Sequence, residues 1–290
     1  MKVYYKLFKT IFLLFLLTSA IHAGSKGRQP FETPYLQDLM CAALQTTARS
    51  PFAYTGEEII NKVDKNITFK NARFESEMVI HIGDEIRTKK LVSYSKGQDT
   101  GFAKFLYPPR DKGVKYLKIE DNLWMYLPSV EKVIKIAGHM LRQSMMGSDM
   151  SYEDALDNTK LKEKYTITLI GSEKIAVDYV KNNKVLSSKK DCYILDLVAK
   201  VKKVTYHRRK IWVDKQFFVP VREELFAKSG KKLKVLRAGN IKNYQGRYFA
   251  TYSTMRNLLR KKSWTEFILK KAEFDIKLAK DIFSHRQLRK

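Results

Sequence analysis

Apolar residues in the first part of the chain recur at the spacing of a helix. One run covers residues 35–44 and stops before Pro51. A second run begins after Thr55, where Thr55 and Glu58 have the three-residue spacing of an N-terminal capping box. Because apolar positions three and four residues apart lie on one face of an α-helix, the pattern predicts two short amphipathic helices.

From about Phe69 the apolar positions change to a period of two, which is typical of strands. Turn-forming pairs such as Gly83-Asp84 and Lys96-Gly97 separate the short apolar runs. The runs cover residues 74–82, 91–95, 102–106, 114–119, 130–136, 165–170, 192–198, 204–213, 217–226, 233–241, 248–255 and 264–276. Many evenly spaced strands with few helices predict a mainly β chain of the α+β class, folded as a large curled antiparallel sheet or barrel. A closing helix is expected over residues 279–288.

Several predicted strands carry large apolar residues on both faces. Phe217 and Val219, for example, alternate with Phe218. Such a face must be covered, either by helices that complete an ordinary core or by a lipid. The periodicity by itself favours the ordinary core and leaves a lipid cavity as the alternative.

The composition excludes two classes of protein. Hydrophobic residues make up 44% of the 290 residues and aromatic residues 12%. This is too apolar for a disordered polycation and too polar for a polytopic membrane protein. The formal net charge is +26, and residues 200–290 hold 26 Lys and Arg against 7 Asp and Glu. This asymmetry predicts an anionic partner, which could be nucleic acid, lipid head groups or an acidic protein face.

Basic residues of the last third occur in clusters between aromatic residues such as Tyr206 and Trp264. The mixture suits single-stranded nucleic acid or the head-group layer of an anionic membrane, and strand-borne lysines are also often simply solvated. The basic surface expected here comprises Lys202, Lys203, Arg208, Arg209, Lys210, Lys231, Lys232, Arg260, Lys261 and Lys262.

The N-terminus has the three parts of a secretory signal peptide. Lys2, Lys6 and Lys9 precede an apolar run over residues 11–17, and small residues lead to the Ala23-Gly24 junction. The run is much shorter than the ~20 residues that span a bilayer as a helix, which favours cleavage over permanent anchoring. The sequence predicts a signal peptide over residues 1–23 and export to the periplasm, with an uncleaved anchor as the alternative. Export also argues against nucleic acid as a partner.

Catalytic and metal-binding motifs are missing from the sequence. It contains no GxSxG, P-loop, GxGxxG, HExxH or CxxC motif, and its histidines are scattered. No metal, cofactor or enzymatic activity is therefore expected. Acidic residues between Asp149 and Asp157 lack EF-hand spacing, whereas Ser151 and Asp154 have the spacing of a capping box that starts a helix. Whether Cys41 and Cys192 form a disulfide stays open.

Four of the nine methionines lie at the one long break in the strand pattern. They are Met140, Met145, Met146 and Met150. Methionine is flexible and polarizable, so a cluster of this kind suits a surface that repacks around variable apolar partners. The segment is either a gating loop over a lipid cavity or a loop that fills the protein's own core.

Three motifs give the chain a resemblance to a known family. They are Phe105-Leu106-Tyr107-Pro108-Pro109-Arg110-Asp111-Lys112-Gly113, Leu123-Trp124-Met125-Tyr126-Leu127-Pro128 and Gln143-Ser144-Met145-Met146-Gly147-Ser148-Asp149-Met150-Ser151-Tyr152-Glu153-Asp154. In this order and density they resemble the LolA-like family of outer-membrane lipoprotein-sorting proteins.

The resemblance implies an incomplete antiparallel β-barrel with a helical lid over residues 55–290, after an extension over residues 24–54. It implies a periplasmic carrier that binds the acyl chains of a lipoprotein or lipid and moves it toward the outer membrane. An inner-membrane transporter and an outer-membrane acceptor would be its partners. In carriers of this fold an arginine on the sheet holds the lid shut. The motifs do not show which residue of this sequence corresponds to that arginine.

Two hypotheses follow for this chain. In the first, an apolar cavity carries acyl chains and an anionic membrane surface is a further partner. The residues expected to line or gate the cavity are Phe105, Leu106, Trp124, Tyr126, Met140, Met145 and Met146. In the alternative, the chain is an exported module that binds lipopolysaccharide or nucleic acid through its basic last third.

Overall fold

The computed structural model describes residues 53–157, 161–181 and 184–290. These residues belong to one compact unit. The predicted signal peptide, the helix expected over residues 35–44 and Cys41 lie outside the described residues.

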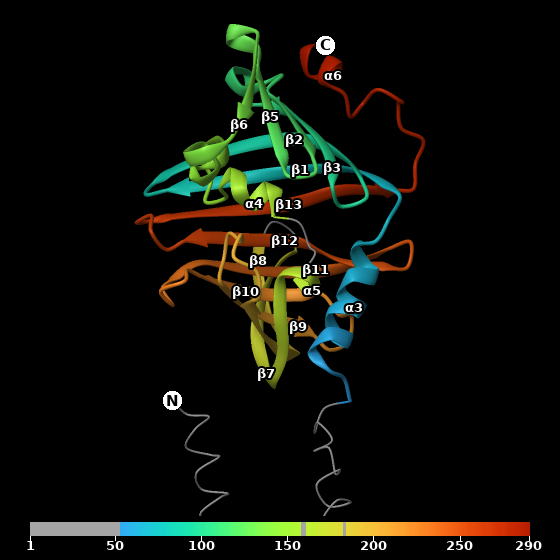
Figure 1. Cartoon of the computed structure of the whole chain (residues 1–290), viewed down its shortest axis with the longest axis vertical. Coiled ribbons are helices and arrows are strands. Elements are labelled where there is room, and N and C mark those ends of the chain that lie inside the picture. The colour runs from blue at the N-terminus through green and yellow to red at the C-terminus, as the bar shows by residue number, and fades with distance from the viewer. Residues whose placement is uncertain (1–52, 158–160, 182–183) are drawn as a thin grey trace, which may run out of the picture. The chain divides into compact units, whose positions relative to one another are not determined.

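Thirteen antiparallel strands form one curled, unclosed sheet in the described part of the chain (Figure 1). Each strand pairs with its neighbours in sequence, except that β1 pairs with β13, so β1 and β13 lie at the centre and β6 and β7 at the two edges. The strands are β1 (Asn71–Ile82), β2 (Glu85–Lys96), β3 (Thr100–Tyr107), β4 (Lys115–Ile119), β5 (Asn122–Leu127), β6 (Lys132–Ile136), β7 (Tyr165–Lys181), β8 (Lys184–Ala199), β9 (Arg208–Asp214), β10 (Pro220–Phe226), β11 (Lys232–Tyr244), β12 (Arg247–Asn257) and β13 (Ser263–Phe274). The predicted mainly β fold with an unclosed curled sheet is confirmed.

Several strands differ in their bounds from the predicted runs: β2, β7 and β8 are longer, and β9 begins later. β5 was not among the expected strands, because its apolar residues are continuous rather than alternating. The run predicted over residues 217–226 begins as a strand only at Pro220. The Asp214 carboxylate accepts hydrogen bonds from the backbone N–H groups of Gln216 and Phe217, and this holds the preceding residues in a turn.

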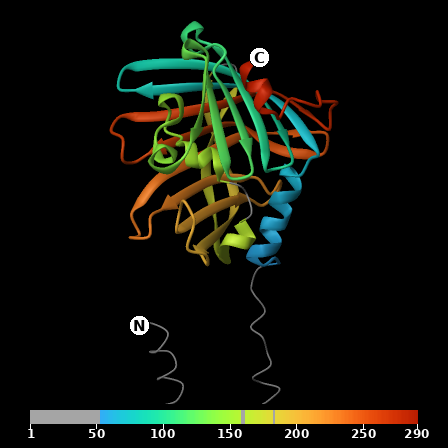
Figure 2. The same cartoon turned by 45° about the horizontal axis from the view of Figure 1, so that its top comes forward.

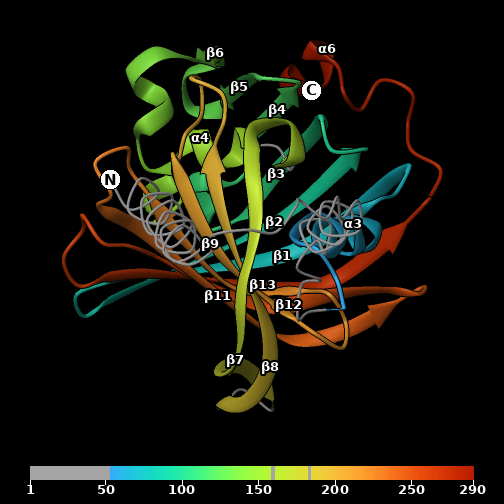
Figure 3. The same cartoon turned by 60° about the horizontal axis from the view of Figure 1, so that its bottom comes forward.

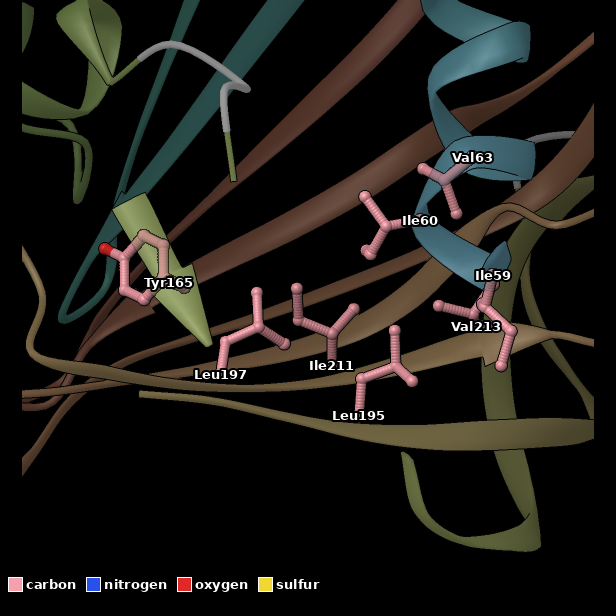
Figure 4. Packing of buried hydrophobic residues seen from close by; sticks show 8 residues of the cluster. All are labelled: Ile59, Ile60, Val63, Tyr165, Leu195, Leu197, Ile211 and Val213. Atoms are coloured by element: carbon pink, nitrogen blue, oxygen red, sulfur yellow. The ribbon is translucent and has the colours of Figure 1, made fainter. Parts of the chain in front are cut away.

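Helix α3 (Gly56–Ile67) begins with the predicted capping box. The Thr55 hydroxyl accepts a hydrogen bond from Glu58 N at 3.2 Å, and the Glu58 carboxylate accepts one from Thr55 N at 2.7 Å. The apolar face of α3 packs on β7, β8 and β9 (Figure 4). Full burial of an aliphatic side chain contributes about 1.5–3 kcal/mol, so the residues on this face fix the helix on the sheet. They are Ile59, Ile60 and Val63.

The lid segment, residues 138–157, lies on the same face of the sheet as α3 (Figure 2). It contains η3 (Gly138–Arg142), η4 (Met145–Gly147) and α4 (Tyr152–Leu156), and the short α5 (Leu161–Lys164) leads into β7. Met145 and Tyr152 of the segment pack on Phe105, Tyr116 and Met125 of the sheet. We call this side of the sheet the lid face and the opposite side the back face.

The chain after β13 covers the back face of β3 to β6. Ile282 and Leu288 are buried there against Phe102 and Leu117. The helix predicted over residues 279–288 is shorter than expected, since α6 spans only His285–Arg289. It starts there because the Ser284 hydroxyl accepts a hydrogen bond from Gln287 N and caps the helix.

The distal half of the β7–β8 hairpin crosses the back face and extends beyond β11 and β12 (Figure 3). Val177 is buried there with Cys192 and Trp212. A Cβ atom on Gly239 of β11 would lie 1.6 Å from the carbonyl oxygen of Asp178. Only a glycine therefore allows β7 to approach β11 this closely.

Candidate functional site

Two adjacent cavities lie between the lid segment and the sheet. One has a volume of about 260 Å³ and the other of about 360 Å³. Met150, Ser253 and Phe267 line both. The space between lid and sheet is thus not filled solid by the protein's own side chains, and its size is of the order found for small-molecule sites, about 300–1,000 Å³.

The smaller cavity is mostly apolar. Met78 of β1 and Phe267 of β13 are register partners, so their side chains point to the same face of the sheet. Leu91 and Leu269 extend this wall, and Met145 closes it from the lid. The arrangement offers hydrocarbon an apolar surface with little competing polar contact.

The larger cavity is polar at its far end. Leu225, Leu236 and Met255 line one part, whereas Asp154, Asp157, Tyr206, Arg209 and Glu223 line the other. The two cavities together therefore run from an apolar end to an end with charged and hydroxyl groups, which is the polarity of an amphiphile.

Asp149 fastens the lid segment to the centre of the sheet. Its carboxylate, 1% exposed, accepts hydrogen bonds from the hydroxyl groups of Ser263 at 2.8 Å and Thr265 at 2.9 Å. It also accepts one from Asn257 N at 3.0 Å. Ser151, not Asp149, caps α4, so Asp149 is a contact to the sheet rather than the start of the helix.

Arg260, in the turn between β12 and β13, fastens the tip of the lid segment. Its Nη1 donates to the carbonyl oxygens of Ser148 at 2.6 Å and Gly147 at 3.2 Å, and to the Ser144 hydroxyl at 3.3 Å. Hydrogen bonds from a charged donor are stronger than neutral ones, so this side chain holds the tip in place.

Asp154 of α4 joins the lid segment to β11 and to the loop before β9. It forms an ion pair with the largely buried Lys234, whose Nζ also lies 3.1 Å from the Ser151 hydroxyl. The Tyr206 hydroxyl donates a 2.5 Å hydrogen bond to the same carboxylate. Burial, together with the nearby Asp154 charge, raises the pKa of Tyr206 well above its usual range, so it remains a donor at any physiological pH.

Arg209 of β9 closes the polar end. Its guanidinium pairs with Asp157 and, at 2.9 Å, with Glu223, and Nε lies 3.2 Å from the Tyr165 hydroxyl. Arg209 was expected on a basic surface, and the structure corrects this, since its side chain is buried on the lid face. Successive side chains of β9 point to opposite faces of the sheet. Arg208 is therefore exposed, whereas Arg209 is buried.

The residues predicted to line or gate the cavity are divided between the two faces. Phe105 of β3 comes together with Met140, Met145 and Met146 of the lid segment in one cluster between the segment and the sheet, and Met145 also lines the smaller cavity. Leu106 is 45% exposed. The structure places Trp124 and Tyr126 on the back face, against the C-terminal segment, because they alternate with Leu123 and Met125.

The other predicted basic residues also have different surroundings. Lys202, Lys203, Lys231, Lys261 and Lys262 are exposed. Arg208 pairs with Asp196, Lys232 pairs with Glu224, Lys210 lies over Trp212 and Arg260 binds the lid segment. The predicted basic residues therefore do not form one continuous surface of unpaired cations.

The sequence analysis did not identify the residues that fasten the lid segment. Lys234, Ser263 and Thr265 are ordinary strand residues by pattern, and their partners lie 80 or more residues away in the chain. The alternation of apolar residues predicted that Met78 and Phe267 lie on strands. It did not show that their side chains face the cavity.

Within the described residues, no group of three or more His, Cys, Asp or Glu side chains is arranged to hold a metal ion. No helix among them is long and apolar enough to cross a membrane.

Comparisons with known proteins agree with this fold. A family model described only as an uncharacterized protein matches residues 97–290. The solved structure of a DUF1329 family protein from Desulfovibrio piger is similar, with a TM-score of 0.69 and 26% identity over 80% of this chain and 97% of that chain. No curated protein matches the chain by sequence.

Two further solved structures share the fold. One is an outer membrane lipoprotein-sorting protein domain from Vibrio parahaemolyticus, with a TM-score of 0.66 and 23% identity over 81% of this chain and 98% of that chain. The other is a LolA superfamily protein from Nitrosomonas europaea, with a TM-score of 0.64 and 22% identity over 81% of this chain and 100% of that chain.

Proposed function

Because this chain belongs to the DUF1329-like family, whose fold is that of the LolA-like lipoprotein-sorting proteins, we propose that it is an exported, non-enzymatic carrier of acyl chains. It takes up the chains of a lipoprotein or lipid between the lid segment and the sheet and moves them through the periplasm toward the outer membrane. An inner-membrane transporter and an outer-membrane acceptor would supply and receive the cargo.

The observation that carries the proposal is a pair of cavities under a segment held by polar contacts. The apolar wall around Met78 and Phe267 would receive hydrocarbon. Each buried methylene contributes about 0.8 kcal/mol, so a long acyl chain gains enough to stay bound in water. The contacts of Asp149, Asp154 and Arg260 can be broken and re-formed without a covalent step, and water replaces them when the segment moves.

The test is whether filling the cavities removes acyl-chain binding. Ser253 lines both cavities, so Ser253→Phe places a ring in the shared space. We expect the affinity for a fluorescent fatty acid to fall at least tenfold relative to the unaltered chain. Ser172→Phe is the matched control, because Ser172 is an exposed serine on β7.

Native mass spectrometry of the chain purified from its own envelope provides the second measurement. A reproducible, stoichiometric lipid or acylated peptide is expected. Empty protein that also takes up no fatty-acid probe would refute the carrier function. Binding that survives 0.5 M salt separates acyl-chain capture from binding of a polyanion through the basic surface, which weakens steeply with salt.

A further inference from the structure

Five large apolar side chains are exposed at one end of the sheet. Ile86 is 63% exposed, Val185 59%, Leu259 59%, Leu258 42% and Trp264 37%. The turn between β1 and β2 and the turn between β12 and β13 meet there, and Gly83 N donates a 2.8 Å hydrogen bond to the carbonyl oxygen of Lys262. We call this the turn-end surface. Such a cluster of exposed apolar residues marks an interaction site, whereas isolated ones do not.

The turn-end surface is held in a fixed shape. His81 pairs with Ile86 on one side and Trp264 on the other, so the three side chains form a row across β2, β1 and β13. The Trp264 ring stacks on His81 with centroids 3.7 Å apart and planes 3° from parallel, and His81 bonds Glu266 at 2.7 Å. The indole is thus held in place while still exposed.

Cations surround these apolar residues. Arg256, Lys261 and Lys262 are exposed, and Arg237, Arg256 and Lys262 line a groove of about 710 Å³ on the back face, next to Leu258 and Trp264. Asp84 and Asp178 are the acidic residues of the groove, and Asp178 is already near Arg237 at 4.0 Å. An indole, several aliphatic side chains and a rim of Arg and Lys match the interface of an anionic bilayer, where rings sit at head-group depth and cations bind phosphate.

We propose that the turn-end surface docks this protein on an anionic phospholipid bilayer, which names a partner for the carrier and rests on the proposed function. Leu258, Leu259 and Trp264 enter the interface, and Arg256, Lys261 and Lys262 bind the lipid phosphates. The docked turn is also the turn that holds the lid segment, because Arg260 follows Leu259 directly and Asn257 N bonds Asp149. Contact with the bilayer therefore acts at the residues that fasten the lid.

The test is sedimentation of the exported full chain with vesicles of phosphatidylglycerol and phosphatidylcholine, against vesicles of phosphatidylcholine alone. We expect Leu258→Ser/Leu259→Ser to lower the partition coefficient on anionic vesicles at least tenfold. Arg256→Glu/Lys261→Glu should lower it similarly. The matched controls are Val198→Ser, at an apolar residue 49% exposed on β8, and Lys202→Glu/Lys203→Glu, and both should bind like the unaltered chain. Circular dichroism of each variant verifies that it is folded.

A local readout uses Trp264. Vesicles that carry brominated lipid should quench the tryptophan emission of the unaltered chain but not that of Trp264→Phe. Equal binding by the Leu258→Ser/Leu259→Ser variant, equal losses with Lys202→Glu/Lys203→Glu, or no quenching that depends on Trp264 would each overturn the proposal. The last outcome would be expected if a protein, rather than a bilayer, covers this surface.

The two proposals fail separately. If docking is wrong but the carrier function is right, fatty-acid uptake persists and the vesicle results do not distinguish the variants. If the carrier function is wrong, the unaltered chain takes up no fatty acid, whatever its binding to vesicles.

Discussion

The guanidinium group of Arg260 lies 2.6 Å from the carbonyl oxygen of Ser148, and this bond joins the β12–β13 turn to the tip of the lid segment. The partners come from positions 112 residues apart in the chain. The contact uses a charged donor and a backbone acceptor, so any residue type at position 148 could accept it. The contact therefore depends on the side chain at position 260 and not on the side chain at position 148.

Arg260→Ala should loosen the lid segment without unfolding the sheet. Loss of a hydrogen bond from a charged donor costs about 1.5–3 kcal/mol when buried, and we expect about 1 kcal/mol at this partly exposed site. Stopped-flow release of a fluorescent fatty acid should then be about fivefold faster. Arg208→Ala, which removes an exposed arginine paired with Asp196, should leave the release rate unchanged. Equal rates in the Arg260 variant and the unaltered chain would contradict this role.

Asp149→Asn should destabilise the fold through hydrogen bonding alone. The amide has the size of the carboxyl group, and its oxygen can still accept from Asn257 N, but its nitrogen cannot replace the Asp149 Oδ2 atom that accepts from the hydroxyl groups of Ser263 and Thr265. A buried group left without its partner costs about 1–3 kcal/mol. Urea denaturation should show this loss in the free energy of unfolding, whereas Asp84→Asn, at an exposed turn residue, should change it by less than about 0.5 kcal/mol. A loss as large at Asp84 would contradict the explanation.

Gly239→Ala should disturb the crossing of the β7–β8 hairpin over the back face. The new Cβ would meet the Asp178 carbonyl oxygen at 1.6 Å, so one of the two backbones must move. Overpacking of this kind costs typically 1–3 kcal/mol, and we expect about 3 kcal/mol because the obstacle is backbone. Gly171→Ala is the control, since its nearest neighbour would be a side-chain carbon at 4.0 Å. Similar unfolding midpoints for the two variants would refute the close approach.

Cys192 should resist alkylation in the folded chain at pH 8. Burial, with smaller contributions from Asp214 and Asp191, raises the pKa of its thiol from 9.0 to about 12. The folded chain therefore keeps the thiol neutral, and this contribution to stability is complete below pH 9 and lost as the pH rises through 12. Peptide mapping after iodoacetamide treatment should find Cys192 unmodified in the native chain and modified in guanidinium chloride. Rapid native modification would show that the hairpin opens.

Local features of the fold could be predicted because neighbouring residues determine them. Thr55 with Glu58, and Ser151 with Asp154, form capping boxes in the structure because the hydrogen bonds close within one turn of helix. The alternation of apolar residues predicted most strands, since side chains on a strand point to opposite faces in turn. The methionine cluster predicted a segment outside the sheet, and the lid segment lies there.

The sequence could not predict which side chains of a strand face the lid and which face the back. The reason is that apolar residues occur at both of the alternating sets of positions. Trp124 and Met125 are both apolar, so the pattern shows that they face opposite ways but not which of them faces the lid. The C-terminal segment covers Trp124 and the lid segment covers Met125, and each comes from a distant part of the chain.

The sequence by itself determined most of the strands, the caps and the break that became the lid segment, because short-range hydrogen bonds and periodic burial act within a few residues. Only the tertiary structure decided that Asp149 meets Thr265 across 116 positions, that Arg209 is buried rather than exposed, and that two cavities remain under the lid. These depend on the curl of the whole sheet, which brings distant residues within hydrogen-bonding distance and leaves no trace in the local pattern of either partner.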